Sequence, residues 1–314
     1  MQINLPKISV IVPTFNRGYI ITKCLESICA QSFKDLEIIV VDDGSTDDTE
    51  AIVKNFNDPR IHYIKHPQNK GLAAALNTGC QAAKTEFIAE LSTDDLWIYA
   101  DKLKKEYMLL NNSGPEIGAV YSDTMKEVIS GEKSVVPPPE LENKEGYLYE
   151  EFLKTNITCF QAALIKKSAW LAVGGVDKEL LRVQDWDFLI NLSKQFKFLH
   201  LPKLTTEVKI SPDSNTKNQK LRLLCRTKIF EKHREAFLKR RQIAATHAYS
   251  IGHAWALLGE MQIARSYLWL AVIKKLNSKN TAAFILSLLN SPAIYKKAAE
   301  VYTRNPHRSF FRFL

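Results

Sequence analysis

Aspartates occur in three clusters along this 314-residue chain, and the spacing of each cluster could support chemistry. Asp42 and Asp43 end an apolar run and precede Gly44, so a carboxylate there could accept hydrogen bonds from a base N–H or from ribose hydroxyls. Asp94 and Asp95 are adjacent carboxylates, which repel each other unless a cation lies between them. Because oxygen ligands of this kind suit Mg²⁺ or Mn²⁺, the second cluster predicts a divalent-cation site.

The third cluster is Arg182-Val183-Gln184-Asp185-Trp186-Asp187, which directly precedes an apolar helical stretch. One of its acids could serve as a general base. Each cluster also has a purely structural interpretation, in which the acids cap turns or helices and complement helix dipoles. For the second cluster the capped helix would be the one that we expect over Leu96–Leu110. Taken singly, the clusters leave both interpretations open.

The elements that would position these acids alternate between strands and helices over the first hundred residues. The expected strands are Lys7–Val12, Leu36–Val41, Ile61–Lys65 and Glu86–Leu91, and the expected helices are Tyr19–Ala30, Thr46–Asn55 and Gly71–Ala83. This order predicts an α/β fold with a mostly parallel sheet and helices on both faces. Ligands of such sheets bind beyond the carboxyl ends of the strands, where the first two acid clusters fall.

The chain is less regular after residue 100, and we place a domain boundary at the turn-rich stretch 211–215. Residues 1–214 would form the first domain, with strands at Ala119–Asp123 and Thr158–Ile165 and a helix at Asp185–Gln195. Residues 215–314 would form an all-helical C-terminal region. Within that region, 245–278 fits either a single tetratricopeptide-like repeat or a plain helical hairpin.

The net charge of the chain changes sign at the same boundary. Residues 215–314 carry 19 Lys and Arg against four Glu, for a net charge of +15, while residues 1–214 carry −6. A basic region of this kind predicts an anionic partner, or else a solvated face without one. No nucleic-acid-reading motif is present, so we do not expect nucleic acid to be that partner. Because aromatic and basic residues interleave between Arg304 and Leu314, we favour an anionic membrane surface.

The five cysteines include no C-x-x-C pair, which predicts free thiols in a reducing compartment. No apolar run approaches the roughly 18 residues of a membrane-spanning helix. The start of the chain shows no pattern of a signal peptide. We therefore expect a cytoplasmic protein, peripheral on the inner face of the membrane if it binds there, neither secreted nor membrane-spanning.

Three motifs in order resemble the family 2 glycosyltransferases, which are inverting enzymes with the GT-A (Rossmann-like) fold. Ile8–Arg17 is similar to the first strand and turn of that family. Ser27–Ser32 followed by Glu37–Asp47 is the most specific stretch, and Asn69–Gly79 is similar to the family's third-helix motif. The resemblance is tight over residues 7–110 and looser to about residue 205.

For nucleotide binding, the resemblance implies that Asp43 contacts the base and that Pro13, Thr14 and Arg17 line the same pocket. Asp42 would support that turn.

For the chemistry, the resemblance implies that Asp94 approaches the ribose or the metal and that Asp95 is the main ligand of a divalent cation (Mn²⁺ or Mg²⁺) on the diphosphate. Asp185 would be the catalytic base, and Trp186 would shape the acceptor side.

Two positions depart from the family pattern. Ser92 stands where the metal motif usually begins with Asp, and Gln184 stands where Glu usually precedes the base. Metal coordination would then rest mainly on Asp95.

The sequence therefore predicts an inverting glycosyltransferase that moves a sugar from a nucleotide-diphospho-sugar, with UDP favoured, to a hydroxyl of a carbohydrate, lipid-linked or protein acceptor. The alternative is a degenerate GT-A protein that only binds nucleotide sugar or acts as a scaffold. A nicotinamide-dependent oxidoreductase would need G-x-G-x-x-G after the first strand, where 13–18 reads Pro-Thr-Phe-Asn-Arg-Gly.

Overall fold

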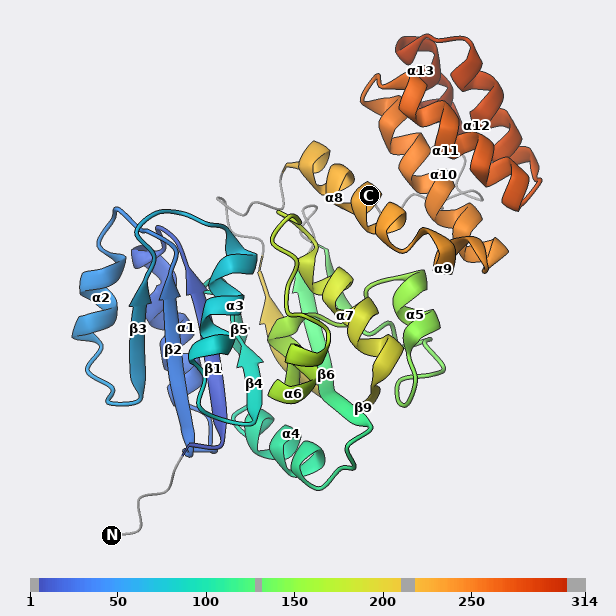
Figure 1. Ribbon diagram of the computed structural model, residues 1–314. Helices are drawn as coiled ribbons and strands as arrows, with labels where there is room; N and C mark the ends of the chain where they lie inside the picture. The colour runs from blue at the N-terminus through green and yellow to red at the C-terminus, as the bar shows by residue number, and fades with distance from the viewer. Residues whose placement is uncertain (1–5, 128–131, 210–217, 304–314) are drawn as a thin grey trace. The chain divides into compact units, whose positions relative to one another are not determined.

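The computed structural model describes residues 6–127, 132–209 and 218–303 (Figure 1). The chain forms two compact units, Met1–Lys217 and Asn218–Leu314. Each unit is described on its own.

The first unit is built on a sheet whose N-terminal half is parallel. β1 (Ile8–Thr14) lies between β2 (Leu36–Asp42) and β4 (Phe87–Glu90), and β3 (Ile61–Lys65) pairs with the outer side of β2. Every residue of β1 and β2 is buried. This is the pattern of parallel strands covered on both faces, and it explains their continuous apolar runs.

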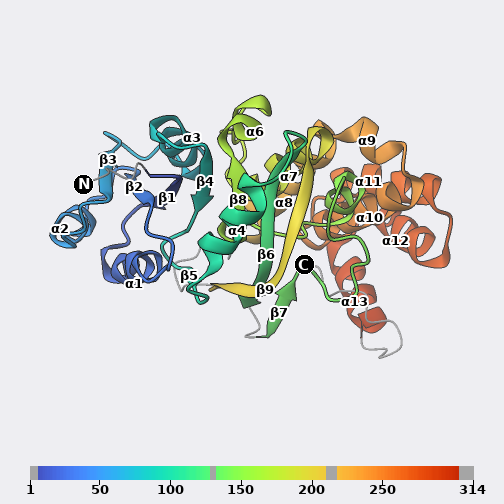
Figure 2. The same ribbon diagram turned by 90° about the horizontal axis from the view of Figure 1, so that it is seen from below.

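Helices cover both faces of these strands. Figure 2 shows α1 (Gly18–Cys29) and α3 (Leu72–Ala82) on opposite sides of β1 and β2. α2 (Thr49–Asn55) contacts α1. Ile21, Leu25 and Ile28 of α1 belong to one buried core with the strands and with Leu103 of α4 (Lys102–Asn111). Turns, rather than these helices, form the edge of the sheet at the carboxyl ends of the strands.

The second half of the sheet is antiparallel where it joins β4. β8 (Ala163–Lys166) runs antiparallel to β4 and to β6 (Ile117–Glu127). β9 (Lys197–Val208) runs parallel to β6. The remaining elements of this unit are β5 (Leu96–Trp97), β7 (Lys133–Val136), α5 (Tyr149–Lys154), the short helix η1 (Phe160–Ala162), α6 (Lys167–Ala172) and α7 (Gln184–Gln195). The sheet is therefore mixed, with antiparallel pairs that the sequence did not predict.

One prediction for this half was wrong in detail, and one strand was not predicted. The helix expected over Leu96–Leu110 begins only at Lys102, because β5 pairs with β9 and the buried Trp97 donates its indole N–H to the Gln161 carbonyl at 2.8 Å. The stretch 197–208 was not recognised as a strand. It mixes apolar and polar residues around a proline, and its pairing with β6 contains register shifts.

The second unit consists of helices over its described residues. They are α8 (Gln219–Lys232), α9 (Arg234–Leu238), α10 (Arg241–Leu257), α11 (Met261–Lys274), α12 (Ser278–Leu288) and α13 (Pro292–Thr303). α10 and α11 form the hairpin expected within 245–278. A Cβ at Gly252 would lie 2.9 Å from the Ala264 carbonyl oxygen, so this glycine allows the two helices to approach closely. Among the described residues, no helix has the length and apolar character needed to span a membrane.

Candidate active site

The first acid cluster stands at the end of β2, and its two aspartates have different surroundings. Asp42 is fully buried. Its carboxylate accepts hydrogen bonds from the Ser45 backbone N–H at 2.7 Å and from the Tyr63 hydroxyl. Asp42 is thus placed to hold the turn that follows the strand, with no surface left for a ligand.

The Asp43 carboxylate holds the loop that leads into α3. Its Oδ1 lies 2.7 Å from His66 Nδ1 and accepts from the Lys70 backbone N–H at 2.9 Å, and its Oδ2 accepts from the Gly71 backbone N–H at 2.7 Å. Gly44, with φ +85°, lets the turn pass against that loop, because a Cβ there would lie 2.8 Å from the Gln68 carbonyl carbon. A carboxylate has about four lone-pair positions, so Asp43 retains acceptor capacity on Oδ2.

The β1 turn runs beside Asp43. The Asp43 backbone N–H donates to the Thr14 carbonyl at 2.8 Å. Pro13 and Thr14 are buried, while Arg17 is half-buried. The Arg17 backbone N–H donates to Thr49 Oγ1, and its guanidinium donates to the Tyr19 hydroxyl. The structure therefore brings Pro13, Thr14 and Arg17 to the strand end that also carries Asp43.

The second acid cluster follows β4, the other neighbour of β1. Strand ends on either side of a central strand lie about 10 Å apart. Asp94 is half-buried and Asp95 is buried. Asp95 Oδ1 accepts from the Lys209 backbone N–H at 3.0 Å. Burial, and then the nearby Asp94 and Glu90 carboxylates, raise the pKa of Asp95 well above its usual range.

Glu90 is a buried acid beside the second cluster that the sequence analysis did not single out. It is the last residue of β4, and its Oε1 accepts from the Ser92 hydroxyl at 2.7 Å, where the family pattern would have Asp. Gln161 Nε2 donates to the same hydroxyl at 2.9 Å. Burial, with Asp94 and Asp185 as smaller contributions, raises the pKa of Glu90 to about 8. The signal in the sequence was an acid inside an otherwise apolar strand.

Asp185 stands in the first turn of α7, after Val183, whose φ is +53°. Asn156 Nδ2 donates to Asp185 Oδ2 at 2.8 Å. The Asp185 carboxylate is also one of the smaller contributions that raise the pKa of Glu90. Burial raises the pKa of Cys159 to about 12, and the Asp185 and Asp95 carboxylates add smaller contributions.

Trp186, which we expect to shape the acceptor side, packs between α7 and α5. It is buried, and its indole N–H donates to the Phe152 carbonyl of α5 at 2.6 Å. The side chain therefore fixes α7 against α5 and offers little surface to an acceptor. An influence on acceptor binding would have to act through the position of α7.

Buried polar atoms without a hydrogen-bond partner gather in this part of the molecule. Among the described residues of the first unit they include Thr14 Oγ1, Glu90 Oε2, Asn156 Oδ1 and Thr158 Oγ1. Thr14 and Glu90 end neighbouring strands, and Asn156 contacts Asp185. Buried polar atoms in native proteins nearly always have a partner, so these atoms indicate bound water or a polar ligand.

Comparison with known proteins identifies the family of this chain. The profile of "Glycosyl transferase family 2" matches residues 9–171, which is more than half of the chain. The chain belongs to glycosyl transferase family 2. The matched range includes the first two acid clusters and ends before Asp185.

Two curated relatives illustrate the range of the family. The chondroitin synthase of Escherichia coli is 26% identical over 206 residues, which is 64% of this chain and 28% of that protein. The GalNAc(5)-diNAcBac-PP-undecaprenol beta-1,3-glucosyltransferase of Campylobacter jejuni is 48% identical over 94 residues, which is 29% of this chain and 30% of that protein. The matches thus span less than a third of either relative.

Solved structures confirm the fold. S. aureus TarS 1–349 in complex with UDP superposes with a TM-score of 0.65 at 20% identity, covering 95% of this chain and 91% of that one. The mannosyltransferase PcManGT from Pyrobaculum calidifontis, in complex with GDP-Man and Mn²⁺, gives 0.63 at 20% identity, covering 97% and 82%. The predicted GT-A fold with a C-terminal helical region is therefore confirmed.

The acids of this family 2 site could hold a divalent cation only with help from a ligand. Over the described residues, no group of three or more His, Cys, Asp and Glu side chains is arranged to bind a metal. Mg²⁺ commonly takes one or two carboxylates and fills its shell with substrate phosphates and water. Asp94 and Asp95 fit that incomplete ligand set. Repulsion from the Asp94 carboxylate contributes to the raised pKa of Asp95.

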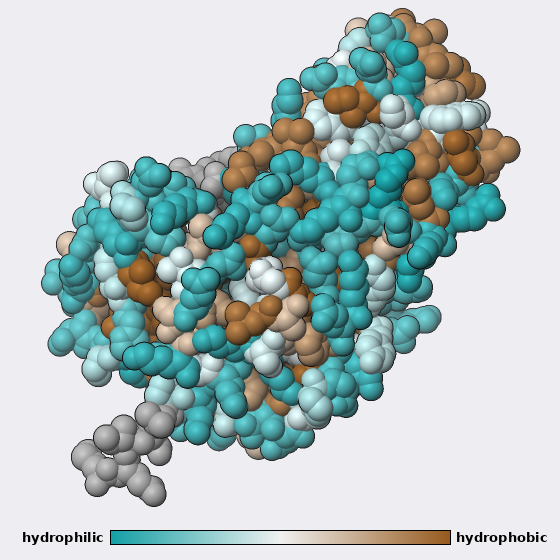
Figure 3. Space-filling view, viewed as in Figure 1, coloured by the Kyte–Doolittle hydropathy of each residue, from teal (hydrophilic) through white to brown (hydrophobic). Residues whose placement is uncertain are grey.

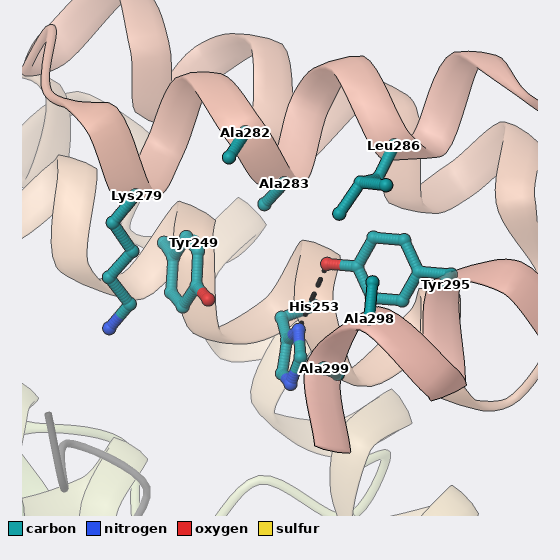
Figure 4. Close-up of a pocket in the computed structure, with 9 residues that line it drawn as sticks. All are labelled: Tyr249, His253, Lys279, Ala282, Ala283, Leu286, Tyr295, Ala298 and Ala299. Atoms are coloured by element: carbon teal, nitrogen blue, oxygen red, sulfur yellow. Dashed lines mark hydrogen bonds between the residues drawn. The ribbon is translucent and has the colours of Figure 1, made fainter. Parts of the chain in front are cut away.

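A separate hollow of about 70 Å³ lies in the second unit, between α10, α12 and α13. Figure 4 shows Ala283 and Leu286 of α12 facing Tyr295, whose hydroxyl lies 2.9 Å from His253 Nδ1. Burial lowers the pKa of His253 to about 4, so the imidazole is neutral at pH 7. The residues that line the hollow include no carboxylate, so it lacks the features of a cation-dependent nucleotide site.

Proposed function

We propose that this family 2 member transfers a sugar from a nucleoside-diphosphate sugar to an acceptor hydroxyl, with inversion at the anomeric carbon. The observation that carries the proposal is the gathering of acids and unsatisfied buried polar atoms at the carboxyl ends of β1, β2 and β4 and at the start of α7. Open α/β sheets bind ligands at this edge.

The nucleotide would bind at the ends of β1 and β2. The remaining lone pair on Asp43 Oδ2 can accept one N–H from a base, and the unsatisfied Thr14 hydroxyl can donate to or accept from the same ligand. Arg17 follows on the same turn, and its positive charge would favour an anionic donor. UDP is the favoured nucleotide, because TarS, a structural neighbour, binds UDP.

The diphosphate would lie beyond β4, at Asp94 and Asp95. We infer that Asp95, with Asp94, holds a divalent cation, as the structural neighbour PcManGT is described with Mn²⁺. When bound, such a cation supplies electrostatic stabilisation of the negative charge that develops on the leaving diphosphate. It would also favour the ionised form of Asp95, which burial and its neighbours oppose.

Asp185 would act as the general base. The hydrogen bond from Asn156 fixes one carboxylate oxygen and leaves the other to accept the proton of the acceptor hydroxyl. As that proton leaves, the hydroxyl oxygen attacks the anomeric carbon and the bond from this carbon to the diphosphate oxygen breaks. A single displacement inverts the configuration.

The acceptor would be a carbohydrate or a lipid-linked saccharide. The relatives support this class, because one is named a chondroitin synthase and another acts on an undecaprenol-linked substrate. We keep protein acceptors as a further option. A cytoplasmic site of action, inferred from the cysteine pattern, remains part of this proposal.

The test is Asp185→Asn, assayed with a panel of nucleotide sugars and Mn²⁺. Loss of a positioned general base costs about 10²–10⁴-fold in rate, so transfer should fall by that factor while the affinity for the nucleotide stays unchanged. Glu140→Gln, an exposed acid in the 137–148 loop, is the matched control and should transfer at the wild-type rate. Asp95→Ala should lose cation-dependent donor binding as well.

Two outcomes would contradict the proposal. Transfer by Asp185→Asn at the wild-type rate would remove the base assignment. Nucleotide-sugar binding without turnover of any donor, with Mn²⁺ and with every acceptor class, would favour the degenerate binding protein instead.

A further inference from the structure

The outer face of α11 and α12 exposes large apolar side chains. Trp269 and Ile273 are four residues apart on α11, and Leu276 follows in the turn; their exposed fractions are 50%, 52% and 79%. On α12, Ile285 and Leu288 are exposed by 54% and 52%. We call these five residues the α11–α12 surface. Figure 3 shows hydrophobic residues along the edge of this unit where Figure 1 draws α12.

These side chains lie opposite the core of the unit. Ala264, Leu268 and Ala271 face inward from α11, and on α12 the inward face includes Ala283, which lines the hollow in Figure 4. The two outer faces join, because the Trp269 and Phe284 rings pack with centroids 5.0 Å apart. Apolar residues at helical spacing on a solvent face indicate a contact with something outside the unit.

The net positive charge of the unit indicates which kind of partner this surface would contact. Residues 218–303 contain fifteen Lys and Arg against four Glu. Lys274 and Lys275 stand between Ile273 and Leu276, and Lys296 and Lys297 follow the exposed Ile294. Two copies of this surface packed against each other would bring like charges together. A polar polyanion would satisfy the lysines but not the apolar side chains.

An anionic lipid bilayer satisfies both features. Interfacial protein segments bury an apolar face at the boundary of headgroups and acyl chains while basic residues contact anionic lipid. We propose that the α11–α12 surface lies on an anionic lipid bilayer. The stretch from Arg304 to Leu314, where the sequence suggested membrane contact, lies outside the described residues.

The test uses the full-length chain in vesicle co-sedimentation. Wild type should sediment with vesicles of phosphatidylglycerol and phosphatidylcholine and stay in solution with phosphatidylcholine alone. The triple variant Ile273→Gln/Leu276→Gln/Ile285→Gln should weaken binding by on the order of tenfold or more, because it removes the apolar part of the contact. Lys275→Glu/Lys296→Glu should also weaken binding, and added salt should lower it further.

A matched triple variant on the first unit provides the control. Met108→Gln/Leu109→Gln/Leu171→Gln changes side chains that are also exposed, and it should bind vesicles like wild type. Transfer to a water-soluble acceptor should be unchanged in both triple variants. The two measurements therefore test vesicle binding independently of the proposed transferase activity.

Three results would overturn the proposal. The first is wild-type protein that fails to sediment with the anionic vesicles. The second is a 273/276/285 variant that binds them as tightly as wild type, which would assign binding to another part of the chain. The third is a wild-type dimer that this variant converts to a monomer in vesicle-free buffer, measured by light scattering, which would assign the surface to self-association.

Discussion

The two units of this chain differ in how many charged side chains they bury. Among the described residues, the first unit buries seven carboxylates, namely Glu37, Asp42, Asp43, Glu90, Asp95, Glu106 and Asp187. Over 218–303 no Asp, Glu, Lys or Arg is in the buried class, and the buried polar residues there are His233, His247, His253, Asn280 and Ser287. Burying an ionised group is costly unless it is paired or hydrogen-bonded, so the first unit must compensate each of its acids.

The units also differ in their exposed apolar residues. Ten large hydrophobic side chains are exposed among the 200 described residues of the first unit, and eleven among the 86 of the second. The density on the helical unit is thus more than twice as high. The first unit concentrates polar groups inside, where a small polar ligand can bind. The second places apolar and basic groups outside, where an extended surface can bind.

The buried ion pair of the first unit provides the strongest test of this comparison. Lys102 Nζ lies 2.6 Å from Glu106 Oε2, and both side chains are fully buried. The Ser122 hydroxyl donates to Glu106 Oε1, and the Lys102 ammonium lies 4.8 Å from the Trp97 ring centroid. Burial holds the pKa of Glu106 above its usual range despite the lysine.

Lys102→Met should lower the free energy of unfolding by about 3–5 kcal/mol, because it leaves a buried carboxyl without its cation. Urea unfolding at pH 7 measures the change. The double variant Lys102→Met/Glu106→Gln should recover a large part of the loss, since it removes the charge that was left uncompensated. A loss under about 1 kcal/mol in the single variant would show that these side chains reach water.

Glu90 gives the next largest effect, and its sign depends on pH. A carboxyl whose pKa is raised to about 8 keeps its proton in the folded state, while the unfolded chain releases it above about pH 4.5. Wild-type stability should therefore fall as pH rises from about 5 to 8, by at most about 1.4 kcal/mol per pH unit from this group. Glu90→Gln cannot titrate, so it should lack this contribution.

Thermal unfolding in EDTA tests this expectation. The melting temperature of Glu90→Gln minus that of wild type should grow with pH across this window. Glu140→Gln, which changes an exposed acid, should show a constant difference. Parallel pH curves for wild type and Glu90→Gln would mean that Glu90 is ionised in the folded protein at neutral pH.

The sequence predicted the first half of the fold well because local pattern and burial agree there. The apolar runs of β1 and β2 are buried on both faces, and the acids after β2 and β4 stand at strand ends, as expected from their positions. The antiparallel half depends on pairings between distant segments. β5 has two residues, and its strand character depends on β9 more than a hundred positions later.

The candidate site was predictable where its residues form motifs. Asp43, Asp95 and Asp185 were proposed from adjacent acids and family-like spacing, and their roles stay predictions. Glu90 and Asn156 were missed, because a single polar residue in a strand or loop acquires meaning only from its neighbours in space. Trp186 was expected to shape the acceptor side. Its ring is buried against α5, so such a role would act through the position of α7 and stays a prediction.

Two leucines of the second unit offer the most direct comparison. Leu268 in α11 is fully buried, whereas Leu276 in the turn before α12 is 79% exposed. Leu268→Ala should lower the free energy of unfolding by about 2–5 kcal/mol, because it leaves a cavity between α10 and α11. Leu276→Gln should change it by less than about 0.5 kcal/mol, because water already surrounds that side chain.

Urea unfolding of both variants at low protein concentration makes this comparison. If Leu276→Gln costs as much as Leu268→Ala, then Leu276 is covered in solution by another part of the chain or by a second copy. Repeating the measurement at high protein concentration separates these causes, since only contact between copies depends on concentration. A small effect at both concentrations would leave the α11–α12 surface free to meet a partner.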